Sequence, residues 1–261
     1  MGLGTSAMES RQAAPVTREA GPMILIEGLD LAGKSTLFAR IQDTLEGSWK
    51  LRWSRNCLVP ENPINERAQE LRKLKQPGSG ISPLETGSLF LASHMWDLCN
   101  FQPPEADTVH LQDSSWLRTV AYHSEAFTPT PFVQEGLPWT LGSFGDLAAQ
   151  VMGEEKTTSG PAFDVVIFLT ASAEERQGRL DERRQKNPED CDYDDALVIR
   201  DPAKFMKLDS LLWEVTLRRF PHARKIDSTG KSRDQVFQEA SATISSCVSG
   251  PLKVAFEAVV P

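Results

Sequence analysis

One run of residues in this chain has the types and spacing that bind phosphate groups. Gly28 is followed by four residues and then by Gly33-Lys34-Ser35, which is the complete pattern of a phosphate-binding loop. The two glycines let the backbone wrap closely around an anion, so that its N–H groups and the start of the next helix face the phosphates. The lysine adds positive charge, and the serine hydroxyl can hold Mg²⁺. The pattern therefore predicts a site for a nucleoside triphosphate.

The predicted phosphate site extends from the first glycine to the threonine after the serine. Its members are Gly28, Leu29, Asp30, Leu31, Ala32, Gly33, Lys34, Ser35 and Thr36. Residues 23–26 are apolar and partly β-branched, as in a buried strand, and residues 37–45 have apolar side chains at helical spacing. A strand, a glycine turn and a helix are the context that such a loop requires. This context disfavours the alternative, a glycine turn beside a surface lysine.

Length and composition limit the class of protein. The 261 residues, 40% of them hydrophobic, suffice for one large α/β domain or two small ones. The net charge of −8 argues against a broadly basic surface, so nucleic acid is not expected as a partner. No apolar run reaches the length of a membrane span, and residues 1–22 lack the apolar stretch of a signal peptide. Together with four widely spaced cysteines, these features favour a cytoplasmic protein with reduced thiols and no membrane partner.

Strands alternate with helices along the rest of the chain. Strands are expected at 49–54, 108–111, 165–169 and 223–226, and helices at 66–74, 83–99, 116–125, 176–185, 202–219 and 233–247. The buried face of the helix at 83–99 is expected to carry Leu84, Leu91, Met95 and Leu98. Alternation of this kind is typical of a parallel sheet wrapped by helices, with its ligand site at the C-terminal ends of the strands. We expect a single domain at 23–247, a disordered leader at 1–22, a loop at 128–138 and a C-terminal tail at 248–261.

These motifs, in this order, resemble the thymidylate kinases, within the wider group of nucleoside and nucleoside-monophosphate kinases. The loop Ile-Glu-Gly-Leu-Asp-x-Ala-Gly-Lys-Ser-Thr at 26–36 is the strongest match. Weaker matches follow in the family's order at Pro60-Glu61, Leu89-Phe90-Leu91-Ala92, Gln112-Asp113, 163–169 and 225–229. The resemblance implies an α/β P-loop kinase with a parallel five-stranded sheet, helices on both faces and a helical lid. It also implies ATP and Mg²⁺ as cofactors, and it allows for a homodimer formed through helices on one side of the sheet.

The resemblance places the lid at about 176–195, where arginines are dense. Arg176, Arg179 and Arg183 recur at a spacing of three and four residues and so share a helix face. Together with Lys34, the lid residues Arg179 and Arg183 would neutralise the charge that develops on a transferred phosphoryl group. The alternative is a solvated charged helix, because acidic residues are interleaved with the arginines.

Three carboxylates follow or adjoin predicted strand ends, where their side chains would converge on the phosphates. Asp113 would hold Mg²⁺ opposite Ser35, although it could also cap the helix that follows. Glu61 would accept the proton of an acceptor hydroxyl, or it is only a turn carboxylate between two prolines. Asp30, inside the loop, faces the sugar of the acceptor in the related family, and it is the other carboxylate placed to accept the proton of an acceptor hydroxyl.

The resemblance also indicates an acceptor pocket. Phe90 would stack on the acceptor base, and simple core packing is the alternative for it. His94, Arg118 and Tyr122 are further candidates to line this pocket, with ordinary packing again the alternative for His94 and Tyr122.

Three departures from the family bear on the acceptor. Family members that phosphorylate a monophosphate hold it with arginines, and at those positions this chain has Asn62, His94 and Ser114. A dianionic phosphate needs charge-assisted donors, and Arg118, one helical turn after Ser114, would be a single cation in place of three. The sequence therefore favours transfer to a hydroxyl of a nucleoside-like or other small molecule. The alternatives are a thymidylate kinase with a rearranged phosphate grip and a nucleotide-binding protein without transfer activity, which the intact loop and Asp113 disfavour.

Overall fold

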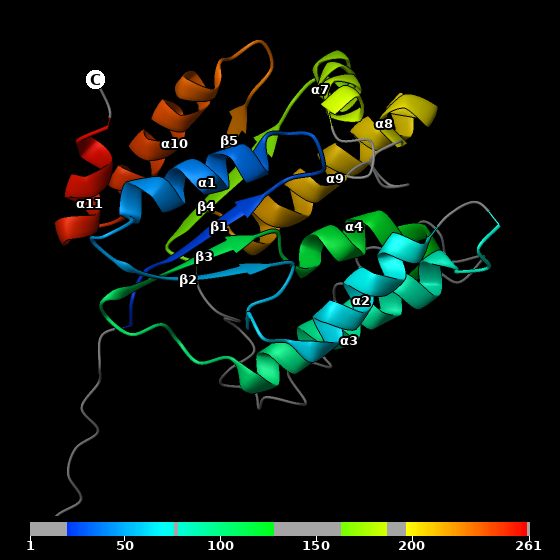
Figure 1. Cartoon of the computed structure of the whole chain (residues 1–261), viewed down its shortest axis with the longest axis horizontal. Coiled ribbons are helices and arrows are strands. Elements are labelled where there is room, and N and C mark those ends of the chain that lie inside the picture. Colours follow the sequence, from blue (N-terminus) through cyan, green and yellow to red (C-terminus); the bar gives the residue numbers. More distant parts are fainter. Residues whose placement is uncertain (1–19, 76–77, 128–162, 187–196, 260–261) are drawn as a thin grey trace, which may run out of the picture.

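The computed structural model describes residues 20–75, 78–127, 163–186 and 197–259. The loop expected at 128–138, nearly all of the leader and the lid beyond residue 186 lie outside these residues. Five parallel strands form one sheet in the order β2-β3-β1-β4-β5 (Figure 1). The strands are β1 (Met23–Glu27), β2 (Lys50–Arg55), β3 (Thr108–Asp113), β4 (Val165–Thr170) and β5 (Arg224–Asp227). This sheet is the one that the α/β prediction requires.

The sequence of each strand matches its place in the sheet. β1 and β4 are buried along their whole length, and such continuous apolar runs are typical of central parallel strands. The edge strands β2 and β5 carry several Lys and Arg residues, which protect an open sheet edge from pairing with other chains. All neighbouring strands run in parallel, and Ile26 of β1 lies opposite both Asp113 and Ile167. The carboxyl ends of the strands therefore meet at one edge.

Helices cover both faces of the sheet. They are α1 (Lys34–Leu45), α2 (Pro63–Leu74), α3 (Pro83–Asn100), α4 (Trp116–Phe127), α7 (Ala173–Lys186), α8 (Leu197–Arg200), α9 (Pro202–Arg219), α10 (Arg233–Cys247) and α11 (Gly250–Glu257). One core joins α1, α10 and α11 to one face of the sheet, and a second core joins α4, α7, α8 and α9 to the other (Figure 1). None of the helices described is long and apolar enough to cross a membrane.

Two expectations about the helices are wrong. Residues 250–257 are not a tail: α11 buries Leu252 and Phe256 completely in the first core. The predicted apolar stripe of α3 is not its fully buried face: Leu84 is 50% exposed, and Leu91, Met95 and Leu98 are half-buried. The buried positions of α3 are instead Thr86, Gly87, Phe90, Ser93, His94 and Asp97. This face is largely polar because α3 packs on α2 and α4 rather than directly on the sheet.

Candidate active site

The phosphate loop joins the end of β1 to the start of α1, as predicted. Gly28 and Gly33 have φ values of 135° and 98°, which L side chains rarely adopt. A Cβ atom on Gly28 would lie 2.2 Å from the carbonyl oxygen of Leu169 in β4, so no other residue fits there. Leu31 also has a positive φ, 65°, and its carbonyl accepts a hydrogen bond from Arg179. The sequence pattern thus reflects both the tight turn and the close approach of β4.

Lys34 is buried, which contradicts the alternative of a glycine turn beside a surface lysine. Its Nζ donates to the carbonyl of Leu29 at 3.0 Å, inside the loop. Burial, together with the nearby charge of Arg118, lowers the pKa of Lys34 to about 8. Asp113 and Asp30 oppose this shift, so both carboxylates lie close enough to influence the lysine. The charge that would meet a phosphate is therefore held inside the loop before any ligand binds.

Asp30 and Asp113 lie in different surroundings. Arg118 Nη2 lies 2.5 Å from both carboxylate oxygens of Asp30, and the hydroxyl of Tyr122 donates to one of them at 2.7 Å. Burial opposes ionisation of Asp30, but Arg118, Lys34, Arg72 and the Tyr122 hydrogen bond together outweigh burial and hold the pKa of Asp30 well below its usual range. Asp113, at the end of β3, accepts from Ser114 Oγ at 3.0 Å and lies 3.6 Å from Arg55 Nε.

The residues present suit Mg²⁺ only together with nucleotide phosphates. In the part of the chain that the structure describes, no group of three acidic, His or Cys side chains could hold a metal ion. Mg²⁺ is usually held by one or two carboxylates plus substrate phosphates and water, and Asp113 and the exposed Ser35 offer such oxygen ligands. The helix α4 is capped by Ser115, whose Oγ accepts from the N–H of Leu117. Asp113 is therefore not the cap, which was its alternative role.

A small cavity of about 30 Å³ lies on the acceptor side of the loop. Its lining residues are Asp30, Asn56, Arg72, Thr86, Phe90, Arg118, Thr119, Tyr122 and His123. The structure thus brings together four predicted residues: Asp30, Phe90, Arg118 and Tyr122. Glu61 does not join them, because it lies exposed in the turn before α2.

The three residues that replace the family's arginines do not form one group. His94 is buried 3.3 Å from Thr119 Oγ1, and burial lowers the pKa of its imidazole to about 3. Asn62 caps α2 and donates its amide to Asp97 and to the carbonyl of Ser93. Ser114 Oγ lies 3.4 Å from Arg118 Nη1, so Ser114 and His94 each contact a residue that lines the small cavity, whereas Asn62 is held by α3. The substitution at Asn62 therefore says nothing about how an acceptor is held.

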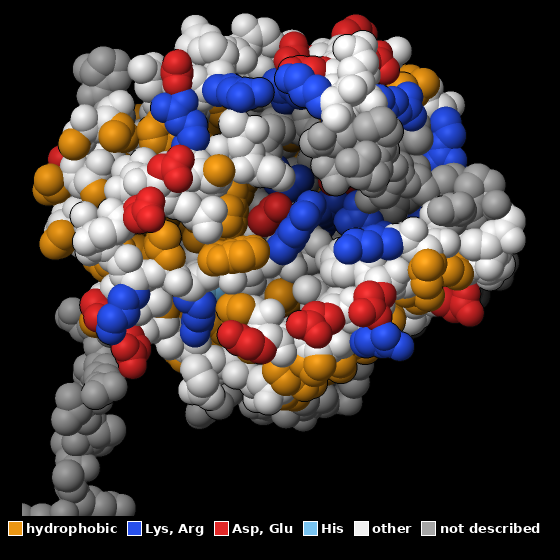
Figure 2. Space-filling model, viewed as in Figure 1, with side chains coloured by type: hydrophobic (Ala, Val, Ile, Leu, Met, Phe, Trp, Pro, Cys, Tyr) orange, Lys and Arg blue, Asp and Glu red, His pale blue; other side chains and the backbone are white. Residues whose placement is uncertain are grey.

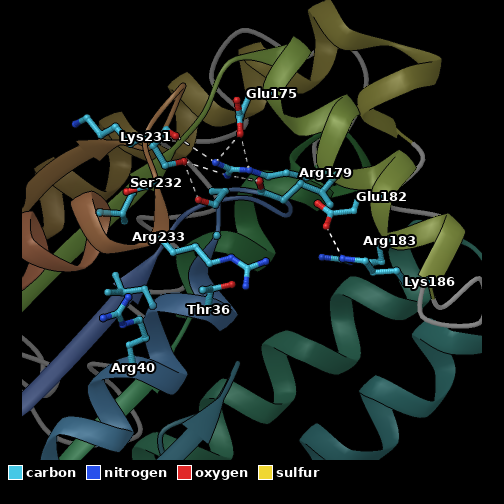
Figure 3. Close-up of a pocket in the computed structure, with 16 residues that line it drawn as sticks. Thr36, Arg40, Glu175, Arg179, Glu182, Arg183, Lys186, Lys231, Ser232 and Arg233 are labelled. Carbon is cyan, nitrogen blue, oxygen red and sulfur yellow. Dashed lines mark hydrogen bonds and ion pairs between the residues drawn. The ribbon is translucent and has the colours of Figure 1, made fainter.

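A second cavity, of about 460 Å³, lies on the other side of the loop (Figure 3). Loop residues 31–33 line it, together with Thr36 of α1, residues of α7 and residues 228–236. Six cationic side chains surround it, against two carboxylates, Glu175 and Glu182: Arg40, Arg179, Arg183, Lys186, Lys231 and Arg233. On the face drawn in Figure 2, Lys and Arg side chains gather around a hollow. The cavity is large enough for a nucleotide and carries the charge that phosphates require.

Comparison with known proteins places this site in a known fold. No family model and no curated protein matches the sequence. The structure is similar to a thymidylate kinase from Candida albicans, with a TM-score of 0.57 and 22% identity, over 87% of this chain and 92% of that one. It is also similar to a thymidylate kinase from Ehrlichia chaffeensis, with a TM-score of 0.53 and 14% identity, over 85% and 97% of the two chains. This chain has the thymidylate kinase fold.

The predicted α/β class, parallel sheet and order of elements of the thymidylate kinase fold are thereby confirmed. Within this fold, sequence reasoning missed several residues near the phosphate loop. Arg55 ends β2 and Asn56 follows it, with a positive φ of 56°. The rule that ligands bind at the carboxyl ends of parallel strands points to these two residues. The family resemblance had instead directed the prediction to Pro60-Glu61, further along the same segment. Arg72, on α2, had no local signal in the sequence.

Glu27 is the other residue that was missed. It is fully buried at the end of β1, and it accepts hydrogen bonds from the N–H of Gly28 and from both the N–H and the hydroxyl of Ser115. Burial raises the pKa of this carboxyl group, and the hydrogen bonds and Lys34 oppose the shift. Glu27 thus ties the start of the phosphate loop to the start of α4.

Proposed function

We propose that this protein is an ATP-dependent phosphotransferase that transfers the γ-phosphoryl group to a hydroxyl of a nucleoside-like small molecule. One observation carries the proposal: a single phosphate loop lines two cavities. Residues 31–33 face the large cationic cavity, and Asp30 faces the small one. A donor bound in the first cavity and an acceptor bound in the second would meet at this loop. The thymidylate kinase fold, shared with enzymes that are named for phosphoryl transfer, supports the proposal.

On the donor side, the triphosphate would lie on the loop N–H groups with Lys34 beside it. Asp113 and Ser35 would hold Mg²⁺ against the phosphates, where the ion neutralises charge during transfer. Arg183 lines the same cavity and would contact phosphate oxygens. In this arrangement the protein contributes mainly orientation and fixed charge, which is what phosphoryl transfer requires of it.

On the acceptor side, binding must include an opening of the cavity. A volume of about 30 Å³ is close to that of one water molecule, whereas a nucleoside needs a pocket of several hundred Å³. The ring of Phe90 and the polar groups of Asn56, Thr119 and Tyr122 would then contact the acceptor. Asp30 is ionised at neutral pH and can accept a hydrogen bond from the acceptor hydroxyl. Glu61, the other predicted base, would reach the hydroxyl only after its turn moved.

A second candidate function is thymidylate kinase activity, and Arg72 is the observation that favours it. With Arg118 it places two guanidinium groups on the small cavity, where the sequence had indicated a single cation. Guanidinium groups bind phosphate with two parallel hydrogen bonds, so a pair of them suits a monophosphate better than a neutral acceptor.

One experiment tests both candidates. Transfer from Mg-ATP would be measured with thymidine, other nucleosides, small alcohols and thymidine monophosphate, for the wild type and for Lys34→Met. We expect transfer to a nucleoside and at least a hundredfold loss in Lys34→Met, by analogy with the loss of a charge-stabilising group elsewhere. Equal turnover in the two proteins would refute the proposed kinase activity.

The charge of Arg72 then distinguishes the acceptors. If a monophosphate binds there, Arg72→Gln should raise the KM for thymidine monophosphate by about tenfold or more, since charge-assisted hydrogen bonds contribute about 1.5–3 kcal/mol. If the acceptor is neutral, this variant should leave its KM nearly unchanged. Lys73→Gln is the matched control, because Lys73 is exposed on the same helix and does not line the cavity.

A further inference from the structure

Four successive carbonyl groups of the phosphate loop each accept a hydrogen bond from a side chain. The carbonyl of Leu29 accepts from Lys34 at 3.0 Å, and that of Asp30 accepts from Arg176 at 2.5 Å. The carbonyl of Leu31 accepts from Arg179 at 2.9 Å, and that of Ala32 from Ser228 Oγ at 3.0 Å. A carbonyl that pointed into the loop would repel a phosphate. Each of these hydrogen bonds instead keeps a carbonyl occupied by a protein donor.

Three of the four donors come from outside the loop and are themselves fixed. Arg176 is fully buried on α7, where it also donates to Asp209 at 2.6 Å and to the carbonyl of Ala171 at 2.9 Å. Ser228, which follows β5, is buried as well, and its single hydroxyl proton is shared between the carbonyls of Ala32 and Thr170, at 3.0 and 2.9 Å. The donors thus belong to α7 and to the segment after β5, which are separate from the loop in sequence.

Arg179 contacts one of the other donors, Ser228. Besides Leu31, its guanidinium donates to Ser228 Oγ at 3.1 Å, to the carbonyl of Ser228 at 3.2 Å and to Glu175 at 3.1 Å. Figure 3 shows its side chain reaching from α7 toward Glu175 and away from Lys186. All of its nitrogens therefore have partners within the protein. This arrangement differs from that of an arginine kept available for phosphate.

We propose that Arg176, Arg179 and Ser228 are positioning residues, a carbonyl clamp that holds the phosphate loop in its anion-binding shape. With the carbonyls of residues 30–32 held outward by the clamp, the loop N–H groups are left for the ligand before it arrives. Preorganised donors of this kind need no rearrangement when the anion binds. The proposal rests on the proposed function only in that the anion is the donor nucleotide. It reassigns Arg179 from phosphate contact to support of the loop.

The test measures the loop before any nucleotide is added. Amide hydrogen exchange of residues 28–35 would be compared in the wild type, Ser228→Ala and Arg179→Gln. We expect faster exchange in both variants without ligand, because each loses donors that fix the loop. The affinity for Mg-ATP should fall about three- to tenfold in Ser228→Ala, the effect of one neutral hydrogen bond, and Ser228→Thr should restore it. Arg184→Gln is the matched control, an exposed arginine of α7 outside the cavity.

Two results would overturn the clamp. If amide hydrogen exchange without ligand were unchanged and only Arg179→Gln lost affinity for Mg-ATP, Arg179 would be a phosphate contact, as first predicted. Unchanged amide exchange and unchanged affinity in both variants would leave Ser228 and Arg179 without a role at the loop and so refute the clamp. Failure of the proposed function looks different, because the wild type and Lys34→Met would then show equal turnover while the exchange results without ligand stood unaffected.

Discussion

Replacing Gly28 by alanine should impair the site more severely than the addition of a single methyl group suggests. The added Cβ would lie 2.2 Å from the carbonyl oxygen of Leu169, and contact between such atoms needs about 3.4 Å or more. The loop must therefore move away from β4 by roughly 1 Å. In addition, alanine at a φ of 135° is strained, at a cost of about 1–3 kcal/mol. We expect a loss of about 2–4 kcal/mol in the free energy of unfolding.

The same shift should lower the rate of transfer. A displacement of about 1 Å in a group that positions the reacting atoms can reduce turnover about a hundredfold. The loss should appear in kcat with the proposed acceptor, because the loop that positions the donor phosphates has moved. The free energy of unfolding would be measured by urea titration, and transfer by a coupled assay corrected for the folded fraction.

Gly47→Ala provides the matched control. Gly47 also has a positive φ, 76°, but a Cβ there would meet nothing within 4 Å. This variant should lose only about 1–2 kcal/mol, the strain of a left-handed alanine, and should keep its transfer rate. If Gly28→Ala lost no more stability than Gly47→Ala and transferred phosphate within twofold of the wild type, close packing of the loop on β4 would not be what the site requires.

Three other outcomes follow from burial and helix formation. Gly178→Ala, in the exposed middle of α7 with nothing near its added Cβ, should raise the free energy of unfolding by about 0.5–1 kcal/mol in a urea titration. Since the pKa of Lys34 is about 8 and phosphate favours its charged form, nucleotide binding should take up protons near pH 8.5 but not near pH 6.5, as calorimetry in several buffers would detect. Burial lowers the pKa of His94 from 6.5 to about 3, below its value in the unfolded chain, so stability should fall as the pH drops below about 6.5. At pH 5.5 this loss is about 1.4 kcal/mol, and a pH-independent difference between the wild type and His94→Gln would refute it.

The order of most elements could be predicted because local signals agree with tertiary packing, whereas the helices α8 and α11 were not expected. Helices at 202–219 and 233–247 have the predicted bounds, and the apolar runs of β1 and β4 are central strands. The face of α3 could not be predicted from an apolar stripe, because its interior neighbours are polar. Ser93, His94 and Asp97 are buried there through hydrogen bonds to residues far away in sequence, and no local pattern records such partners.

The acceptor side was harder to predict from the sequence, again because its hydrogen bonds join residues that are far apart in the chain. Asp97 accepts hydrogen bonds from the N–H groups of Leu58 and Val59, at 2.6 and 3.0 Å. Asn62 adds a third bond to Asp97 at 2.8 Å. These contacts anchor the segment after β2 to α3, which leaves Glu61 exposed on that turn. Glu61 therefore does not line the small cavity, and the residues beside it in this segment and on α2 are Asn56 and Arg72.

Asp30 joins the two sides of the site, and its bonds limit what the acceptor can be. Its carbonyl is held by Arg176 of α7, and its carboxylate by Arg118 and Tyr122 of α4. Separating a buried ion pair without a substitute partner costs about 3–5 kcal/mol. A neutral acceptor offers Arg118 no counter-ion, so it must bind with this pair intact, and its hydroxyl would donate to Asp30 alongside Arg118 and Tyr122. An acceptor that carries a phosphate can draw Arg118 to that phosphate, which then receives the phosphoryl group, and leave Asp30 to a sugar hydroxyl. The Asp30–Arg118 pair, more than the missing arginines, is thus the feature on which the choice of acceptor depends.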